Sequence, residues 1–175
     1  MERIFVARGV LALVFAVLVF LAIGLIPDYA ARIFAGFSIL DGLLALAAAY
    51  RAHPSWTNPR KSALFAEGFI ACVAGVVIAF HDHDASVIAF AIAANAIIGG
   101  ALASVYSMSE KTEYRADWWA VYGILGVVLG FAVAPLMALG IPAMLLAVGV
   151  VTAVQGIARL MLRGGSGRKT VGVNA

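Results

Sequence analysis

Six apolar runs, each long enough to cross a membrane, make up most of this sequence. A transmembrane helix needs about 20 consecutive, mostly apolar residues. The polar breaks between the runs lie at Pro27-Asp28, Arg51 to Lys61, His81 to Asp84, Met108 to Asp117 and Gly140 to Pro142. The breaks place the spans at roughly 4–26, 29–50, 62–80, 85–107, 117–139 and 142–162. The sequence therefore predicts an all-α, polytopic membrane protein with six transmembrane helices.

Composition supports this assignment and excludes several other classes. Hydrophobic residues make up 64% of the 175 residues and charged residues only 12%, whereas soluble domains carry about 25% charged residues. The six spans leave no room for a soluble domain, so we expect one transmembrane domain over residues 1–163 and a disordered cytoplasmic tail over 164–175. A single cysteine excludes an intramolecular disulfide. The net charge of +3 does not indicate nucleic-acid binding.

The distribution of Lys and Arg predicts the orientation in the membrane. Basic residues gather on one side of the predicted bundle: Arg3, Arg8, Arg51, Arg60, Lys61, Lys111, Arg115, Arg163, Arg168 and Lys169. The other side has no Lys, and its one candidate Arg is Arg32, in the first turn of the second span. Because cytoplasmic loops are enriched in Lys and Arg, we expect both termini in the cytoplasm. The first run is too long for a signal peptide, so we expect a retained span.

Regularly spaced glycines indicate an internal repeat. Gly9, Gly68 and Gly123 each open an odd-numbered span, and Gly42, Gly100 and Gly156 follow them after 33, 32 and 33 residues. Two spans return the chain to its starting side, so the units run parallel. We predict three helical-hairpin repeats, at about 4–51, 62–107 and 117–163, related by a pseudo-threefold axis along the membrane normal. Glycines at such spacing allow close helix packing.

Several short motifs resemble the HdeD family of acid-resistance membrane proteins. They are Arg8-Gly9-Val10-Leu11-Ala12-Leu13, Asp41-Gly42 and Glu67-Gly68, set in the three-hairpin layout, and the resemblance covers about residues 7 to 163. The family has a Trp-Pro-Gly-like turn between paired helices. Ile26-Pro27-Asp28 and Gly140-Ile141-Pro142 match it in part, and His81-Asp82-His83-Asp84 departs from it. The resemblance implies a bacterial inner-membrane protein linked to survival of acid or other stress, without a known catalytic mechanism.

Asp41 is the most informative polar residue inside the predicted spans. At 1.5 Å per residue it lies about 15 Å from the boundary at Arg51, near the middle of the membrane. A charged group there costs about 2.5–3.5 kcal/mol on insertion scales. Burial favours the neutral carboxyl, which could then carry protons. Alternatively, Asp41 fixes the packing between repeats through hydrogen bonds.

Arg8, Glu67 and Tyr122 occupy equivalent positions in the three repeats, each directly before the first glycine. If all three face a common axis, Arg8 and Glu67 can form an ion pair and Tyr122 can add its hydroxyl. The alternative interpretation is an ordinary ion pair at the membrane interface.

Three more polar residues lie within the predicted spans. Gln155 is the counterpart of Asp41 in the third repeat, so we expect a hydrogen bond between them. Asn95 lies in the middle of the fourth span and could join the same polar layer. We expect Arg159, one turn after Gln155, to extend its side chain toward the cytoplasmic surface.

The turn His81-Asp82-His83-Asp84 gathers two imidazoles and two carboxylates on the outer face. Imidazoles gain charge in mildly acidic solution, so this turn could sense periplasmic pH. The same side chains could hold a divalent metal ion, but adjacent residues in a tight turn seldom converge on one ion without further ligands. A solvated polar turn is the third interpretation, and we predict no metal site.

The sequence predicts no catalytic residues and no cofactor, since it contains no P-loop, dinucleotide-binding motif or plausible catalytic triad. We therefore expect a protein that is not an enzyme. Three hypotheses remain open: an HdeD-type stress protein, a small proton or solute transporter or channel using Asp41 and the polar layer, and an accessory subunit of a larger membrane complex. The expected partners are the lipid bilayer and, in some of these cases, further copies or other membrane proteins, but no nucleic acid.

Overall fold

Six long α-helices account for nearly all of the described chain. The computed structural model describes residues 2–25, 27–51, 58–81, 84–109 and 113–164. The helices are α1 (Glu2–Leu25), α2 (Pro27–Tyr50), α3 (Asn58–Phe80), α4 (Ala85–Ser109), α5 (Glu113–Ala138) and α6 (Ile141–Gly164). All six are long and apolar enough to cross a membrane, which confirms the predicted class of all-helical membrane protein.

The helix boundaries differ from the predicted ones mainly at their polar ends. Helix α3 begins at Asn58 rather than near 62, and α5 begins at Glu113 rather than near 117. The prediction followed the apolar runs, but a helix can continue into the interfacial region, where water and headgroups satisfy its polar side chains. Gly164, predicted to begin the tail, is the last residue of α6. The remainder of the predicted tail lies outside the described residues.

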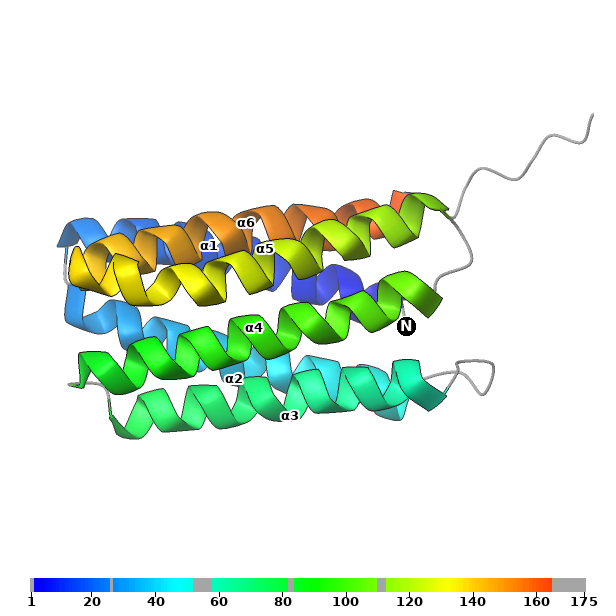
Figure 1. Ribbon diagram of the computed structural model, residues 1–175, viewed down its shortest axis with the longest axis horizontal. Coiled ribbons are helices and arrows are strands. Elements are labelled where there is room, and N and C mark those ends of the chain that lie inside the picture. The colour runs from blue at the N-terminus through cyan, green and yellow to red at the C-terminus, as the bar shows by residue number, and fades with distance from the viewer. Residues whose placement is uncertain (1, 26, 52–57, 82–83, 110–112, 165–175) are drawn as a thin grey trace, which may run out of the picture.

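Each helix packs against its neighbours in the chain, and α1 also packs against α6. The start of α1 and the end of α6 lie at the same end of the bundle (Figure 1). We call this the terminal end. The helix ends at Tyr50, Asn58, Ser109 and Glu113 lie there too, and the opposite end, here the turn end, carries the junctions within each helix pair (Figure 1). This up-and-down order closes into a ring in which α1 packs against both α2 and α6.

The chain forms three helix pairs, α1–α2, α3–α4 and α5–α6. Glycines let the backbones approach closely where one pair meets the next, and where the last pair meets the first. A Cβ atom on Gly42 of α2 would lie 2.6 Å from the carbonyl oxygen of Gly68 on α3. One on Gly123 of α5 would lie 2.7 Å from the Gly100 oxygen on α4. One on Gly156 of α6 would lie 3.0 Å from the Gly9 oxygen on α1. The regularly spaced glycines therefore meet between helix pairs, not within them.

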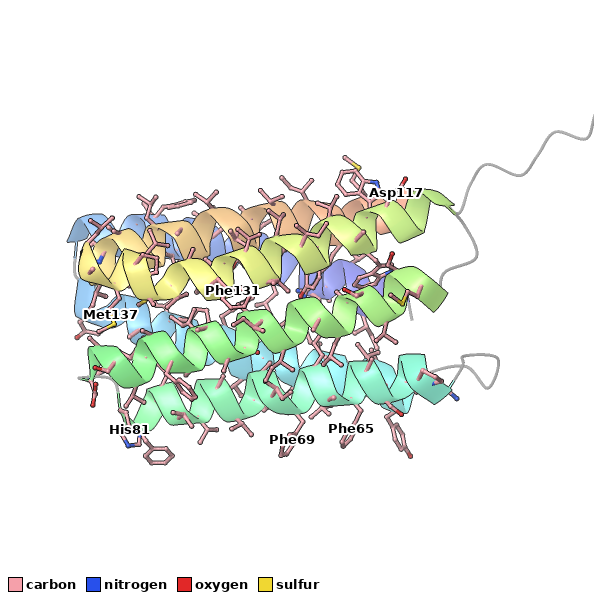
Figure 2. The ribbon with its side chains drawn as sticks, in the orientation of Figure 1. Phe65, Phe69, His81, Asp117, Phe131 and Met137 are labelled. Carbon is pink, nitrogen blue, oxygen red and sulfur yellow. The ribbon has the colours of Figure 1, made fainter. Side chains whose placement is uncertain are left out.

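Two buried apolar clusters fill the bundle at different depths. The cluster nearer the turn end contains Phe15, which stacks on Phe37 at a centroid distance of 4.2 Å, and large aliphatic residues such as Ile92. The cluster nearer the terminal end contains Leu64, Trp119 and Tyr122. Large apolar side chains such as Phe65, Phe69 and Phe131 instead point outward (Figure 2), as expected for surfaces that face lipid.

Candidate functional site: a buried ionic cluster

Arg8 and Asp41 form a two-pronged ion pair inside the bundle. Arg8 Nε donates to Asp41 Oδ1 and Nη2 donates to Asp41 Oδ2, each at 2.8 Å. The Arg8 residue is 0% exposed, and Asp41 is buried as well. Paired parallel hydrogen bonds of this kind fix both the distance and the plane of the two groups. They tie the first turns of α1 to the second half of α2.

Glu67 joins the same cluster from α3. Arg8 Nη2 donates to Glu67 Oε1 at 2.6 Å, so the predicted contact between Arg8 and Glu67 is present. The Tyr122 hydroxyl on α5 donates to the same oxygen at 3.4 Å. The three residues that precede the first glycine of each predicted repeat therefore meet inside the bundle.

Arg159 points into the bundle, which contradicts the prediction that it extends toward the surface. Its Nη1 donates to Asp41 Oδ1 at 3.0 Å, and its Nη2 donates to Asp41 Oδ2 at 3.2 Å and to the Tyr122 hydroxyl. Its guanidinium carbon lies 4.9 Å from the centre of the Tyr122 ring, within the range of a cation–π contact. The residue is 3% exposed. The ion pairs with two buried carboxylates stabilise the guanidinium inside the bundle more than hydration at the membrane surface would.

The cluster is balanced in formal charge. Two guanidinium groups, from Arg8 and Arg159, face two carboxylates, from Asp41 and Glu67, at ion-pair distances of 2.6–3.5 Å. Both arginines contact both carboxylates. Each oxygen of Asp41 accepts a hydrogen bond from both arginines, which favours the interpretation that Asp41 fixes packing through hydrogen bonds.

Gln155 makes a different hydrogen bond from the one predicted. Its Nε2 donates to the backbone carbonyl oxygen of Tyr122 at 3.3 Å, where a bond to Asp41 was expected. Arg159, one turn away on the same helix, occupies the Asp41 oxygens instead. The bond between Gln155 and Tyr122 joins α5 to α6, as the bond between Arg8 and Asp41 joins α1 to α2, and both span 33 residues of sequence.

A small cavity adjoins the cluster in the membrane interior. Its volume is about 60 Å³, enough for a few water molecules. Its polar lining includes Asp41, Glu67, Asn95, Gln155 and Arg159, so the structure brings five of the predicted intramembrane residues to one space. The rest of the lining is largely apolar: Phe34, Phe37, Ala71, Ile92, Ala96, Leu129 and Val148 with several glycines, Tyr122 and Thr152.

Along the helices, the ionic cluster of Arg8, Asp41, Glu67, Tyr122 and Arg159 lies between the two apolar clusters. On α2, Asp41 falls between Phe34 of the first and Ala45 of the second, and on α3, Glu67 falls between Leu64 and Ala74. Trp119 packs edge-on against Tyr122 at 5.8 Å on the terminal side. The charged groups are therefore enclosed by apolar side chains in both directions along the membrane normal.

Two residues of the turn between α3 and α4, His81 and Asp84, are described by the structure, and both contact the backbone of the adjoining helices. His81 is exposed at the end of α3 (Figure 2), with Nδ1 3.1 Å from the Val77 carbonyl oxygen. Asp84 Oδ1 accepts from the backbone nitrogens of Ser86 at 2.9 Å and Val87 at 3.3 Å, which is the geometry of a helix N-cap. Asp82 and His83 lie outside the described residues. Among the described residues, no group of three or more His, Cys, Asp or Glu side chains could hold a metal ion.

The family comparison matches most of this bundle. The model of a family described as a short repeat of unknown function, DUF308, matches residues 7–80 and 84–134. The chain belongs to this family. DUF308 comprises membrane proteins and includes HdeD-like proteins. No curated protein matches the chain at a significant level, and no solved structure does.

The DUF308 segments contain four of the five residues of the cluster. Arg8, Asp41 and Glu67 fall in the first matched segment and Tyr122 in the second, whereas Arg159 lies beyond both. The last member of the charge-balanced cluster is therefore supplied by a part of the chain outside the two matched segments.

Proposed function

We propose that this protein is an HdeD-type member of DUF308 in a bacterial inner membrane, acting without catalysis in resistance to acid or general stress. Three helical hairpins would surround a pseudo-threefold axis, with both termini in the cytoplasm. Family membership supports the HdeD-type assignment. The glycine pairs between successive helix pairs support the threefold arrangement, and the one-sided distribution of Lys and Arg supports the orientation.

The observation that carries this proposal is the charge-balanced cluster enclosed in the bundle. Side chains from α1, α2, α3, α5 and α6 meet in it, so five helices are fixed to one another by hydrogen bonds. Apolar side chains enclose it on both sides. Such a bundle is suited to stay closed and intact when the surroundings acidify, and a passive role in the membrane needs no bound cofactor.

Survival under acid tests this proposal directly. A bacterial strain lacking the gene should leave fewer survivors after an acid challenge than its parent, and a plasmid copy of the wild type should restore survival. A plasmid copy carrying Gly36→Ala serves as a control and should restore survival as the wild type does, because a Cβ there meets nothing within 4 Å and Gly36 lies outside the lining of the cavity. Equal survival of the deletion strain and its parent in acid and in other stresses would refute the stress role.

Proton or solute transport is the second candidate function, and the cavity favours it. Asp41, Glu67, Asn95 and Gln155 line one space in the membrane interior, as a binding site in a transport path would require. If the protein conducts protons, purified protein in liposomes should dissipate an imposed pH gradient, followed with an internal dye, and Asp41→Asn should abolish the leak. A gradient that decays no faster than in empty liposomes would exclude the transport hypothesis for protons.

A further inference from the structure

A groove on the outside of the bundle lies between the last turns of α2 and the first turns of α3. It has a volume of about 360 Å³ and six lining residues: Leu46, Ala49, Tyr50, Lys61, Ser62 and Phe65. Tyr50 is 93% exposed and Phe65 is 58% exposed. Phe65 points away from the bundle in Figure 2, so the groove faces the surroundings and not the interior.

The groove crosses the expected boundary of the membrane. By hydropathy the span in α2 ends at Tyr50 and the span in α3 begins at Lys61. Leu46 and Phe65 lie one helical turn further in, at about 6 Å of rise. The polar lining residues are therefore at the depth of lipid headgroups, and the apolar ones are at the depth where acyl chains begin.

The electrostatics at the mouth of the groove favour an anion. The sequence contains no Asp or Glu between Asp41 and Glu67, but it contains Arg51, Arg60 and Lys61 there. Lys61 has no ion pair within the described part of the chain. Arg51 follows Tyr50 directly and is exposed. A basic side chain at the membrane surface attracts anionic lipids by about 1 kcal/mol.

We propose that this groove binds one anionic phospholipid. The Lys61 ammonium and the Ser62 hydroxyl would hold the phosphate, and the first part of an acyl chain would lie along Leu46, Ala49 and Phe65. A cation at headgroup depth directly above an apolar channel matches the two parts of a phospholipid. A soluble anion would use the cation but would leave the apolar channel empty.

Titration with defined lipids, followed by native mass spectrometry of the detergent-solubilised protein, tests the site. Phosphatidylglycerol should bind more tightly than zwitterionic phosphatidylethanolamine. Lys61→Gln should weaken phosphatidylglycerol binding by about fivefold, the ratio that corresponds to the contribution of one basic side chain. It should weaken phosphatidylethanolamine binding less, because that lipid's own ammonium offsets the charge of its phosphate. Arg32→Gln is the matched control, because Arg32 is an exposed basic residue at the other end of α2.

A second variant tests the shape of the groove without changing its charge. Ala49→Phe should fill the channel and weaken the binding of both lipids. Because Ala49 also packs against the apolar cluster nearer the terminal end, the unfolding temperature of the variant is measured alongside to show that it is folded. Inorganic phosphate should not compete with phosphatidylglycerol. The proposal is overturned if Lys61→Gln binds phosphatidylglycerol as the wild type does, if Arg32→Gln weakens it equally, if Ala49→Phe has no effect, or if phosphate displaces the lipid.

Discussion

Replacing Arg159 with alanine should destabilise the folded bundle by about 3–5 kcal/mol, the range for removing one partner of a buried ion pair. The variant would leave Arg8 alone to balance Asp41 and Glu67, so the enclosed cluster would carry a net negative charge. The Tyr122 hydroxyl would also lose the guanidinium that donates to it. Thermal unfolding in detergent can be followed with a thiol-reactive dye, because Cys72 is the single cysteine of the chain and lies partly buried on α3.

Two further variants separate the charge balance from a general effect of losing an arginine. Arg32→Ala removes an exposed arginine of α2 that contacts the exposed ring of Tyr29 and should change stability by no more than about 1 kcal/mol. The double variant Asp41→Asn with Arg159→Met restores a neutral cluster. It should be less destabilised than the sum of its single changes, with a coupling of about 0.5–3 kcal/mol. If Arg159→Ala unfolds at the same temperature as Arg32→Ala, the cluster does not hold the helices together.

The helices could be predicted closely because continuous apolar runs of about 20 residues have few alternatives to membrane helices. The predicted breaks at Pro27, His81 and Gly140 lie within one residue of helix ends at the turn end of the bundle. At Gly140 the backbone φ is +104°, a conformation that glycine adopts without strain. The polar starts of α3 and α5 were placed too late, since hydropathy reports where a helix enters the apolar core and not where its hydrogen bonding begins.

The site could be predicted only where the predicted repeat assigned equivalent positions to its residues. Equivalent positions predict that Arg8, Glu67 and Tyr122 meet, and they do. Arg159 has no such counterpart, and its place near a helix end alone predicts the wrong direction for its side chain. A charge count over the spans would have found it: two carboxylates, Asp41 and Glu67, need two cations. Arg159, and not Gln155, bonds to Asp41. Which of the two side chains reaches Asp41 depends on the distance between neighbouring helices, and the spacing of residues along one helix does not give that distance.

Adding one methyl group at Gly100 should destabilise the protein by about 1–3 kcal/mol, the usual cost of overpacking. The new Cβ would lie 2.8 Å from the backbone nitrogen of Val127 and nearer still to the Gly123 oxygen on α5. Backbone atoms cannot move aside as a flexible side chain can, so α4 and α5 would have to separate. Gly42→Ala should act in the same way between α2 and α3. The loss for Gly100→Ala can be measured as a lowered unfolding temperature with the Cys72 dye, and that for Gly42→Ala by circular dichroism, because its Cβ would lie 2.6 Å from the Cys72 sulfur.

The chain offers a control beside each of these glycines. Gly99→Ala, one residue from Gly100, and Gly36→Ala, on the same helix as Gly42, would place their Cβ atoms where nothing lies within 4 Å. Alanine is favoured over glycine inside a helix by about 0.5–1 kcal/mol, so neither control should lower stability. A contrast between Gly100→Ala and Gly99→Ala would show that close backbone contact between successive helix pairs, and not glycine content, holds this bundle together. Equal effects of the two changes would mean that α4 and α5 can move apart freely, and the close approach would then contribute nothing to stability.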